Sequence, residues 1–462
     1  MLRHVVLLQT LSIAAPIALR EKQRVVGIIG SGMAGASTAH FLRELRPDLR
    51  VVVWERDAIV GGRARTADLG GRRVDLGATA ISTLNQYLLS FTAGMRRANG
   101  NGSSTLGIYD GAGFRFRSRE GALPLAAHLT ARYGPSWLKV LPMVKATASN
   151  LSRIYDLQRR GVAFRTPASL LGALGLYELT QVSAYEYLHS LPRAFVEEFI
   201  DGASRDNYGQ DGSLNAFADL VSLAGAGLAG DVFSLEGGTA QIPQSFLASS
   251  GAEVRLRTRV DAARLRPGNY YAVVDSTGRE TRVDALVVAT PIEFTNMSLP
   301  PDVRYRPRPY QATCVALAAG RLSRRVFGPR AGELDTVLTV DTADVRFSCV
   351  GAHGAVAGGD PIYKVMSRQR LSDAELDTYV FERRSSTVVR RTGTPPVPTR
   401  NWIPRPGVPG RRSCSASVFF TPTWNRPCPA WRLKLLPRRT SRCSSRRRCL
   451  RRYVLCVTEA FL

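Results

Sequence analysis

The chain has 462 residues, more than one compact core usually holds, so we predict two interleaved domains. Its apolar content of 44% is typical of a globular rather than a fully disordered protein. The formal net charge of +26 does not indicate that the main part of the chain binds nucleic acid. Residues 383–462 hold 19 basic residues and one acidic residue, whereas the other 382 residues carry only +8.

The N-terminal segment has the features of a secretory signal peptide. Arg3 and His4 precede an apolar run that ends in small residues near Ala18, and this run is too short to span a membrane. We therefore predict a signal peptide at residues 1–20. Three glycosylation sequons agree with a secreted protein, at Asn101, Asn150 and Asn296. No second apolar run reaches membrane-spanning length, so no stable membrane span is expected.

A dinucleotide-binding motif follows at residues 25–35. The apolar run Val25 to Ile29 predicts a buried parallel strand, and G-S-G-M-A-G then predicts a turn into a helix that ends near Leu45. In such a turn the first glycine permits the tight bend, the second lets backbone approach a pyrophosphate, and the third lets the helix contact the strand. The candidate pyrophosphate residues are Gly30, Ser31, Gly32, Met33, Ala34 and Gly35.

A second predicted strand, Val51 to Trp54, ends at Glu55, 20 residues after Gly35. An acidic residue at this spacing accepts hydrogen bonds from the adenosine ribose, so we assign Glu55, with the adjacent Arg56, to the ribose side of the site. The alternative is a βαβ unit without a ligand.

Two further glycine-containing segments follow the second strand. In V-G-G-R-A-R-T, at 60–66, Gly62 and Arg63 are suited to a loop that lies flat on a ligand and pairs with phosphate. A surface glycine turn is the alternative. Residues 72–78 then predict a strand that ends in a small-residue turn, where Gly77 and Ala78 would permit the close approach of a flat ring.

Residues 120–230 have mostly helical periodicity. We expect helices over 126–139, 144–160 and 184–199, and a buried helix within 213–226 that is nearly apolar on all sides. After a turn at 233–239 we expect a helix from Ala240 to Ser249 and a strand from Glu253 to Val260. A hairpin at 266–269 and a buried strand at 284–290 complete the predicted return to the first sheet.

Four segments together resemble the prenylcysteine oxidase (prenylcysteine lyase) family of the flavin amine-oxidase-like superfamily. They are G-I-I-G-S-G-M-A-G-A-S-T-A-H-F-L, G-G-R-A-R-T, the block from D-N-Y-G-Q to S-L-N-A-F-A-D-L-V-S-L-A-G-A, and S-L-E-G-G-T. The first two occur across the superfamily, and the third is specific to this family. The resemblance covers about residues 24–382.

The resemblance implies an α/β fold in which a Rossmann-type FAD-binding domain is interleaved with an α+β substrate domain. The implied division is 24–100 and 236–295 for the FAD-binding domain, 101–235 for a helical substrate-binding region, and 296–382 for the rest of the substrate domain. FAD would occupy the residues named above, and backbone at Val260 would reach its adenine. The apolar helix at 214–226 would line an isoprenoid tunnel, with core packing as the equal alternative.

The implied reaction is the oxidative cleavage of farnesyl- or geranylgeranylcysteine by dioxygen and water, in the lysosome or vacuole. No side chain is assigned as a catalytic acid or base. The cysteines form no paired C-x-x-C and the five histidines are scattered, so no metal site is expected. Two alternatives remain: another flavin enzyme, such as an amine oxidase or isoprenoid desaturase, and a non-catalytic basic protein that is secreted or binds nucleic acid.

Residues 383–462 differ in composition from the rest of the chain. They hold five of the seven cysteines, lack hydrophobic periodicity, and are rich in arginine, serine and proline, which predicts disorder. They also stand where the family has its closing flavin motif, which resembles N-x-E-S-A-x-S-x-M-E-x-E-A-x-A-A. We therefore predict that the chain from a point between 383 and 420 is a wrong-frame translation, with a genuine basic tail as the alternative.

Back-translation of residues 422–437 supports a shifted reading frame. If each new codon begins on the third base of the old one, Trp424 and the first bases of Asn425 give GAA, which encodes glutamate. Around that forced glutamate, codon degeneracy permits N-V-E-S-A-V-S-G-M-E-T-E-A-A-A without a break. The permitted sequence matches the closing motif at its expected place.

Overall fold

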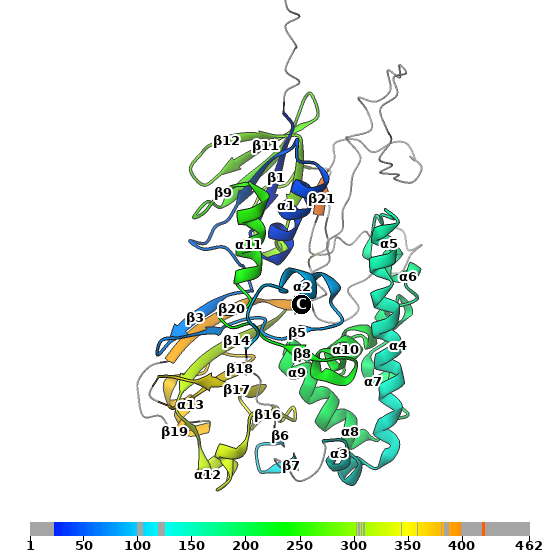
Figure 1. Cartoon of the computed structure of the whole chain (residues 1–462), viewed down its shortest axis with the longest axis vertical. Helices are drawn as coiled ribbons and strands as arrows, with labels where there is room; N and C mark the ends of the chain where they lie inside the picture. Colours follow the sequence, from blue (N-terminus) through cyan, green and yellow to red (C-terminus); the bar gives the residue numbers. More distant parts are fainter. Residues whose placement is uncertain are drawn as a thin grey trace, which may run out of the picture.

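The computed structural model describes residues 23–98, 105–118 and 125–382, except 302, 304, 306, 308, 309, 343, 358 and 380, together with strands at 388–398 and 418–420. The predicted signal peptide and the sequon at Asn101 lie outside these residues. Figure 1 shows two lobes, with β1 and α1 in the upper lobe and β14 to β18 in the lower lobe beside a column of helices.

The upper lobe is built on a mainly parallel sheet in the order β21-β13-β1-β2-β9. Its strands are β1 (Val25–Ile29), β2 (Arg50–Trp54), β9 (Glu253–Arg255), β13 (Ala285–Val288) and β21 (Val418–Phe420), of which only β21 is antiparallel to its neighbour. Runs of valine and isoleucine favour such strands, because both faces of a parallel sheet are buried. The predicted strands at 25–29, 51–54 and 284–290 are confirmed within one or two residues.

Both faces of this sheet are covered. Helices α1 (Met33–Leu45) and α11 (Gln241–Ser250) pack on one face, where Ala36 and Phe246 share a core cluster with the sheet. An antiparallel sheet packs on the other face, through Tyr271 against the buried Trp54. This second sheet comprises β10 (Val260–Arg266), β11 (Tyr270–Asp275) and β12 (Glu280–Val283), so the hairpin predicted at 266–269 is confirmed.

The prediction of one strand from Glu253 to Val260 is wrong. Strand β9 ends at Arg255, and β10 begins a different sheet at Val260. The break has a physical cause, because Arg257 adopts a left-handed backbone conformation with φ of 52°. The N–H groups of Arg257 and Thr258 turn back to donate to the carbonyl oxygens of Asp57 and Glu55, at 2.9 and 2.8 Å.

The lower lobe contains a seven-stranded sheet in the order β20-β14-β18-β17-β16-β6-β7. Its strands are β6 (Leu106–Tyr109), β7 (Phe114–Arg117), β14 (Tyr310–Ala319), β16 (Thr336–Thr339), β17 (Cys349–Ala355), β18 (Pro361–Ser367) and β20 (Val388–Pro398). Two boundaries differ from the expected ones. The region 101–235 is not purely helical, since it contributes β6 and β7, and the segment from 383 onward contributes β20. The predicted disorder of the remaining tail concerns residues outside the described part, apart from β21.

The remaining elements are short. They are β3 (Thr66–Leu69), β4 (Arg72–Asp75), β5 (Ile81–Ser82), α2 (Gln86–Phe91), β8 (Val232–Phe233), β15 (Arg321–Leu322), α12 (Arg324–Phe327), α13 (Asp373–Tyr379) and β19 (Phe381–Glu382). The last four belong to the lower lobe (Figure 1), where Leu322, Phe327 and Leu376 share a core cluster with the seven-stranded sheet. Strands β3 and β4 form a hairpin, and the predicted strand at 72–78 therefore ends at Asp75.

The helical column is more broken than its periodicity predicts. Its helices are α3 (Leu125–Tyr133), α4 (Val140–Ser152), α5 (Ile154–Arg159), α6 (Pro167–Ala173), α7 (Ala184–Tyr187), α8 (Arg193–Phe195), α9 (Asp201–Tyr208) and α10 (Ala216–Leu223). The helix expected over 126–139 is interrupted at Gly134 and Pro135, and the one expected over 184–199 is interrupted before Pro192. Proline lacks the N–H that an interior helical position needs, which explains both breaks.

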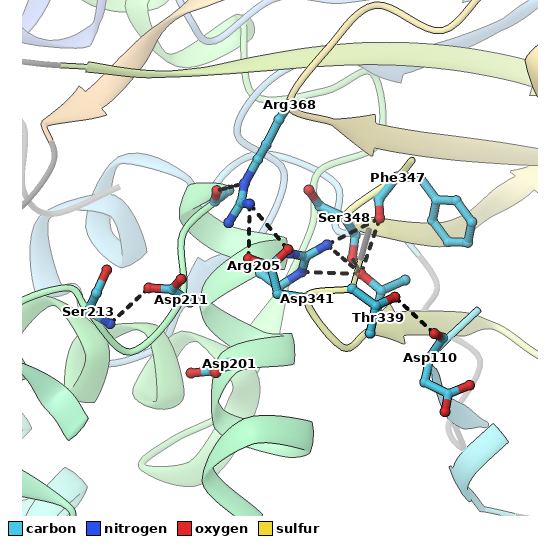
Figure 2. Close-up of polar contacts among 12 residues, drawn as sticks. Asp110, Asp201, Arg205, Asp211, Ser213, Thr339, Asp341, Phe347, Ser348 and Arg368 are labelled. Carbon is cyan, nitrogen blue, oxygen red and sulfur yellow. Dashed lines mark hydrogen bonds and ion pairs between the residues drawn. The ribbon is translucent and has the colours of Figure 1, made fainter. Parts of the chain in front are cut away.

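An arginine-rich cluster joins α9 to the seven-stranded sheet (Figure 2). The buried Arg205 of α9 donates to Thr339 Oγ1 at 3.0 Å and pairs with Asp341. Arg368, which follows β18, pairs with the same carboxylate at 2.9 Å and donates to the Gly209 carbonyl oxygen at 2.9 Å. The end of α9, and with it the turn of the N-Y-G-Q segment, is thus fixed to the sheet.

Candidate functional site

The first glycine turn has the geometry of a dinucleotide-binding turn. Gly30 has φ of 101°, and its N–H donates to the Trp54 carbonyl oxygen at 2.8 Å. A Cβ on Gly35 would lie only 1.9 Å from the Gly30 carbonyl oxygen. Gly30 is therefore needed for the bend and Gly35 for the close contact between α1 and β1.

Helix α1 directs its N-terminus toward this turn. It begins at Met33 with Gly32 as N-cap, and its first turn contains no acidic residue. The unpaired N–H groups and positive dipole end of such a helix favour a bound anion. Ala34 is buried against the sheet and Met33 is half-buried, so these two residues contribute packing and backbone.

The second glycine segment lies directly on the first. The Gly61 N–H donates to the Ser31 carbonyl oxygen at 3.2 Å, and Gly62 has φ of 57°. A Cβ on Gly32 would meet only Gly62 and Gly61, at 3.7 and 3.9 Å, so Gly32 faces a space bounded by backbone. The predicted pyrophosphate residues and Gly62, with the adjacent half-buried Arg63, are therefore brought together.

Glu55, the predicted ribose residue, lies against the first glycine turn. It is 8% exposed, and its Oε2 accepts hydrogen bonds from the N–H and Oγ of Ser31 at 3.0 and 2.5 Å. Its Oε1 accepts from the Asp57 N–H at 2.9 Å. A carboxylate has about four acceptor sites, so these three bonds leave capacity for a ribose hydroxyl.

Two other predicted adenosine residues are placed differently. Arg56 extends toward solvent, with its Nε 4.0 Å from Asp57 Oδ1. Val260 is buried in the core between the two upper-lobe sheets, two residues after Thr258, whose N–H binds the Glu55 carbonyl oxygen. Val260 is thus near the ribose acid along the chain, and only its backbone is suited to a ligand contact.

Gly77 and Ala78 form a tightly held turn at the junction of the lobes. A Cβ on Gly77 would lie 1.9 Å from the Arg63 carbonyl oxygen, so this turn contacts the second glycine segment. The Ala78 carbonyl oxygen accepts a hydrogen bond from Thr239 Oγ1 at 2.7 Å, and the Gly77 carbonyl oxygen accepts one from Lys364 Nζ at 2.7 Å. The three predicted glycine segments are therefore linked by close backbone contacts.

Sequence reasoning missed the ionisable groups beneath this turn. Lys364 of β18 is 5% exposed, and burial lowers its pKa although Asp75 and Asp206 oppose that effect. Cys349 of β17 donates to Asp206 Oδ1 at 2.7 Å, and burial raises the pKa values of both groups. A signal for Lys364 was present, because it is the single charge in the strand P-I-Y-K-V-M-S.

The structure favours core packing for most of the apolar helix at 214–226. Leu220 and Leu223 of α10 belong to the main core cluster of the helical column, and Phe217 belongs to a second cluster. A hollow of about 210 Å³ lies elsewhere, beside Gln23, Arg50 and Glu253. These residues stand at the amino ends of the parallel strands, opposite the edge at which dinucleotides bind.

The residues present fit FAD. Position 32 is open where a pyrophosphate would lie, Glu55 has acceptor capacity for a ribose, and the 77–78 turn offers backbone without bulky side chains. Within the described residues, no group of three His, Cys, Asp or Glu side chains could hold a metal ion. Nor, in the same part of the chain, is any helix long and apolar enough to cross a membrane.

Comparison with known proteins agrees with this arrangement. The family model described as prenylcysteine lyase matches residues 121–406, and one described as NAD(P)-binding Rossmann-like domain matches residues 28–93. The first match extends beyond residue 382, where the resemblance was expected to stop.

Relatives match over most of the chain. Farnesylcysteine lyase from Arabidopsis thaliana is 28% identical over 396 residues, which cover 80% of this chain and 78% of that protein. Human prenylcysteine oxidase 1 is also 28% identical over 396 residues, covering 78% and 77%.

Solved structures show the fold. A double mutant of putrescine oxidase superposes with a TM-score of 0.58 at 16% identity, covering 86% of this chain and 88% of that one. Cyclohexylamine oxidase from Brevibacterium oxydans gives 0.55 at 16% identity, covering 80% and 85%. The fold is therefore α/β and amine-oxidase-like, with a Rossmann-like domain. The prenylcysteine lyase model matches more than half of the residues of this chain, so the chain belongs to the prenylcysteine lyase family.

Proposed function

We propose that this protein is an FAD-dependent thioether oxidase that acts on farnesylcysteine or geranylgeranylcysteine. The observation that carries the proposal is the prenylcysteine lyase match over residues 121–406, which includes the N-Y-G-Q turn fixed by Arg368. The glycine turns of the upper lobe also support the proposal, because their backbone fits the pyrophosphate of FAD.

The overall reaction balances with dioxygen and water. The carbon next to sulfur loses a hydride, water adds to the resulting sulfur-stabilised cation, and the adduct collapses to free cysteine and a prenyl aldehyde. Bound FAD would supply the redox chemistry, as the acceptor for the hydride and the donor of two electrons that convert dioxygen to hydrogen peroxide. One thioether, one water and one dioxygen thus yield one thiol, one aldehyde and one peroxide.

The residues of this chain would bind the cofactor and hold it in a fixed orientation. The backbone at Gly30 to Gly35 and at Gly62 would hold the pyrophosphate, Glu55 the ribose, and the Gly77–Ala78 turn the ring end of the cofactor. Holding the reacting atoms in place and excluding water are the contributions that a protein makes to such chemistry. We assign no catalytic acid or base.

The proposed setting is the secretory pathway, with the lysosome or vacuole as destination. The proposed partners are the isoprenoid thioether and dioxygen, with no nucleic acid. The signal-peptide features of residues 1–20 support this setting.

Incubation of the full chain with FAD and farnesylcysteine tests the proposal. We expect oxygen uptake together with equal amounts of free cysteine and farnesal. Oxidation of a primary amine with the thioether untouched would instead establish the amine-oxidase alternative. DNA retention that falls with salt and survives deletion of residues 383–462 would support the non-catalytic alternative.

A further inference from the structure

A buried ammonium group fixes the turn at which the ring end of the cofactor would lie. Lys364 Nζ donates to the Gly77 carbonyl oxygen at 2.7 Å and to Thr79 Oγ1 at 3.0 Å. The Ala78 carbonyl oxygen is occupied as well, because Thr239 Oγ1 donates to it at 2.7 Å. Both carbonyl oxygens of the turn are therefore bound within the protein.

The ammonium group has donor capacity beyond these two bonds. An ammonium carries three N–H donors, and among the described residues only Gly77 and Thr79 accept from this one. Burial of a charged group with an unused donor is costly unless something compensates for it. Lys364 is only 5% exposed, so water supplies little compensation.

Two carboxylates act on this charge. Asp75, at the end of β4, is hydrogen-bonded by the N–H and Oγ1 of Thr239 at 2.9 and 3.0 Å. Asp206, on α9, is hydrogen-bonded by Cys349. Both carboxylates attract Lys364, although neither makes a direct salt bridge with it within the described residues. The charge is therefore held by two hydrogen bonds and attracted by two carboxylates, without a direct salt bridge among the described residues.

We propose that Lys364 is a positioning residue for the ring end of bound FAD, which sets the turn at 77–79 and places a positive charge beside the ring. This inference rests on the proposed function. Two-electron reduction adds negative charge to a flavin, and a nearby cation stabilises that charge. Lys364 thereby favours the reduced cofactor.

Three variants test the inference in the full chain with saturating FAD. Lys364→Met removes the charge at similar length, Lys364→Arg retains it, and Lys145→Met is a matched control at an exposed position on α4. The measurements are the FAD dissociation constant and the two-electron midpoint potential.

We expect Lys364→Met to lower the equilibrium constant for reduction at least tenfold, a fall of about 30 mV. Lys364→Arg should recover most of that shift, and Lys145→Met should show none. A purely structural role would weaken FAD binding without a charge-dependent potential. The inference would be overturned if Lys364→Met kept the midpoint potential of the parent chain. It would also be overturned if Lys364→Arg lowered the midpoint potential as much as Lys364→Met does.

Amine labelling of the unmutated chain provides a test that does not depend on the folding of a variant. Lys139 and Lys145 are exposed and serve as internal references for Lys364. Because Lys364 is buried, it can be labelled only when the turn at 77–79 opens. Bound FAD should hold that turn closed, slow the labelling of Lys364 at least tenfold and leave the reference lysines unchanged. If FAD is retained and Lys364 labels at an unchanged rate, only this inference fails. If no FAD binds even at saturating concentration, the proposed function fails as well.

Discussion

The Cα atom of Gly32 lies 2.9 Å from the position that a Cβ would take on Gly62. Two glycine turns that are 30 residues apart in sequence therefore touch through their backbones. Observed Cβ atoms essentially never approach another atom so closely, and Gly62 also has a positive φ of 57°. The proposed pyrophosphate site is a backbone surface whose shape depends on the absence of side chains.

Gly32→Val should weaken FAD binding at least tenfold, about 1.4 kcal/mol. Its branched side chain would enter the space above Gly61 and Gly62 where a pyrophosphate would lie. Retention of FAD after gel filtration measures the effect. Gly94→Val is the control, because a Cβ there meets no atom within 4 Å. Equal retention in both variants would refute the assignment of the cofactor site.

Gly77→Ala should destabilise the fold by roughly 1–3 kcal/mol, as overpacking does. The added methyl would lie 1.9 Å from the Arg63 carbonyl oxygen, and the backbone must move to admit it. Gly172→Ala in α6 is the matched control, since its Cβ is unobstructed and alanine favours a helix by roughly 0.5–1 kcal/mol. Urea unfolding of both variants would decide, and equal midpoints would contradict the expectation.

Two buried carboxyl groups in the helical column predict a pH dependence. Asp219 of α10 is fully buried, with Oδ1 bound by Ser204 Oγ and Oδ2 without a partner among the described residues. Burial raises the pKa of Asp219 to about 7. Burial also raises the pKa of Asp201 to about 6, despite hydrogen bonds from Tyr185 and Gly212.

The free energy of unfolding should therefore fall as pH rises from about 4 to 7. In that range the folded state keeps protons that the unfolded state, with a pKa near 3.9, has released. The slope from Asp219 alone is about 1.4 kcal/mol for each pH unit. Asp219→Asn should flatten the dependence, which urea unfolding between pH 4.5 and 7.5 would reveal. Parallel curves for the variant and the parent chain would show that Asp219 is not the source.

The sequence predicted the upper lobe better than the lower one. Glycines at 30, 32 and 35 have spacing that few other structures require, and the strands beside them are short and apolar. Local patterns also predicted the hairpin at 266–269. The change of sheet at Arg257 was not predictable, because a left-handed arginine has no local signature.

The lower-lobe groups depend on long-range packing. Lys364 meets Gly77 across 287 residues of chain, and Cys349 meets Asp206 across 143. Local hydrophobic periodicity cannot predict contacts between residues so far apart in the sequence. A lysine within an apolar strand signals a buried charge, but the identity of its acceptors follows only from the fold.

Sequencing of the transcript across residues 383–420 should reveal a missing or extra base or a misplaced splice. The prenylcysteine lyase match ends at residue 406, inside this window and before the shifted motif that begins at 422. The chain as written would then lack one wall of its cofactor site and bind FAD weakly. A clean read in the present frame would refute the shift, and the basic tail would stand as genuine.

The pairing of β20 with β14 gives the position of that shift a physical meaning. Strand β14 is ten residues long, mostly buried and apolar, and β20 covers one of its edges from Tyr310 to Ala318. An uncovered strand of this kind presents free backbone groups to other chains and promotes aggregation. Residues 388–398 of the chain as written cover this edge, and the family match continues to residue 406, so a loss of frame is expected after Pro398. The product would keep the edge of β14 covered and lack only the closing flavin motif.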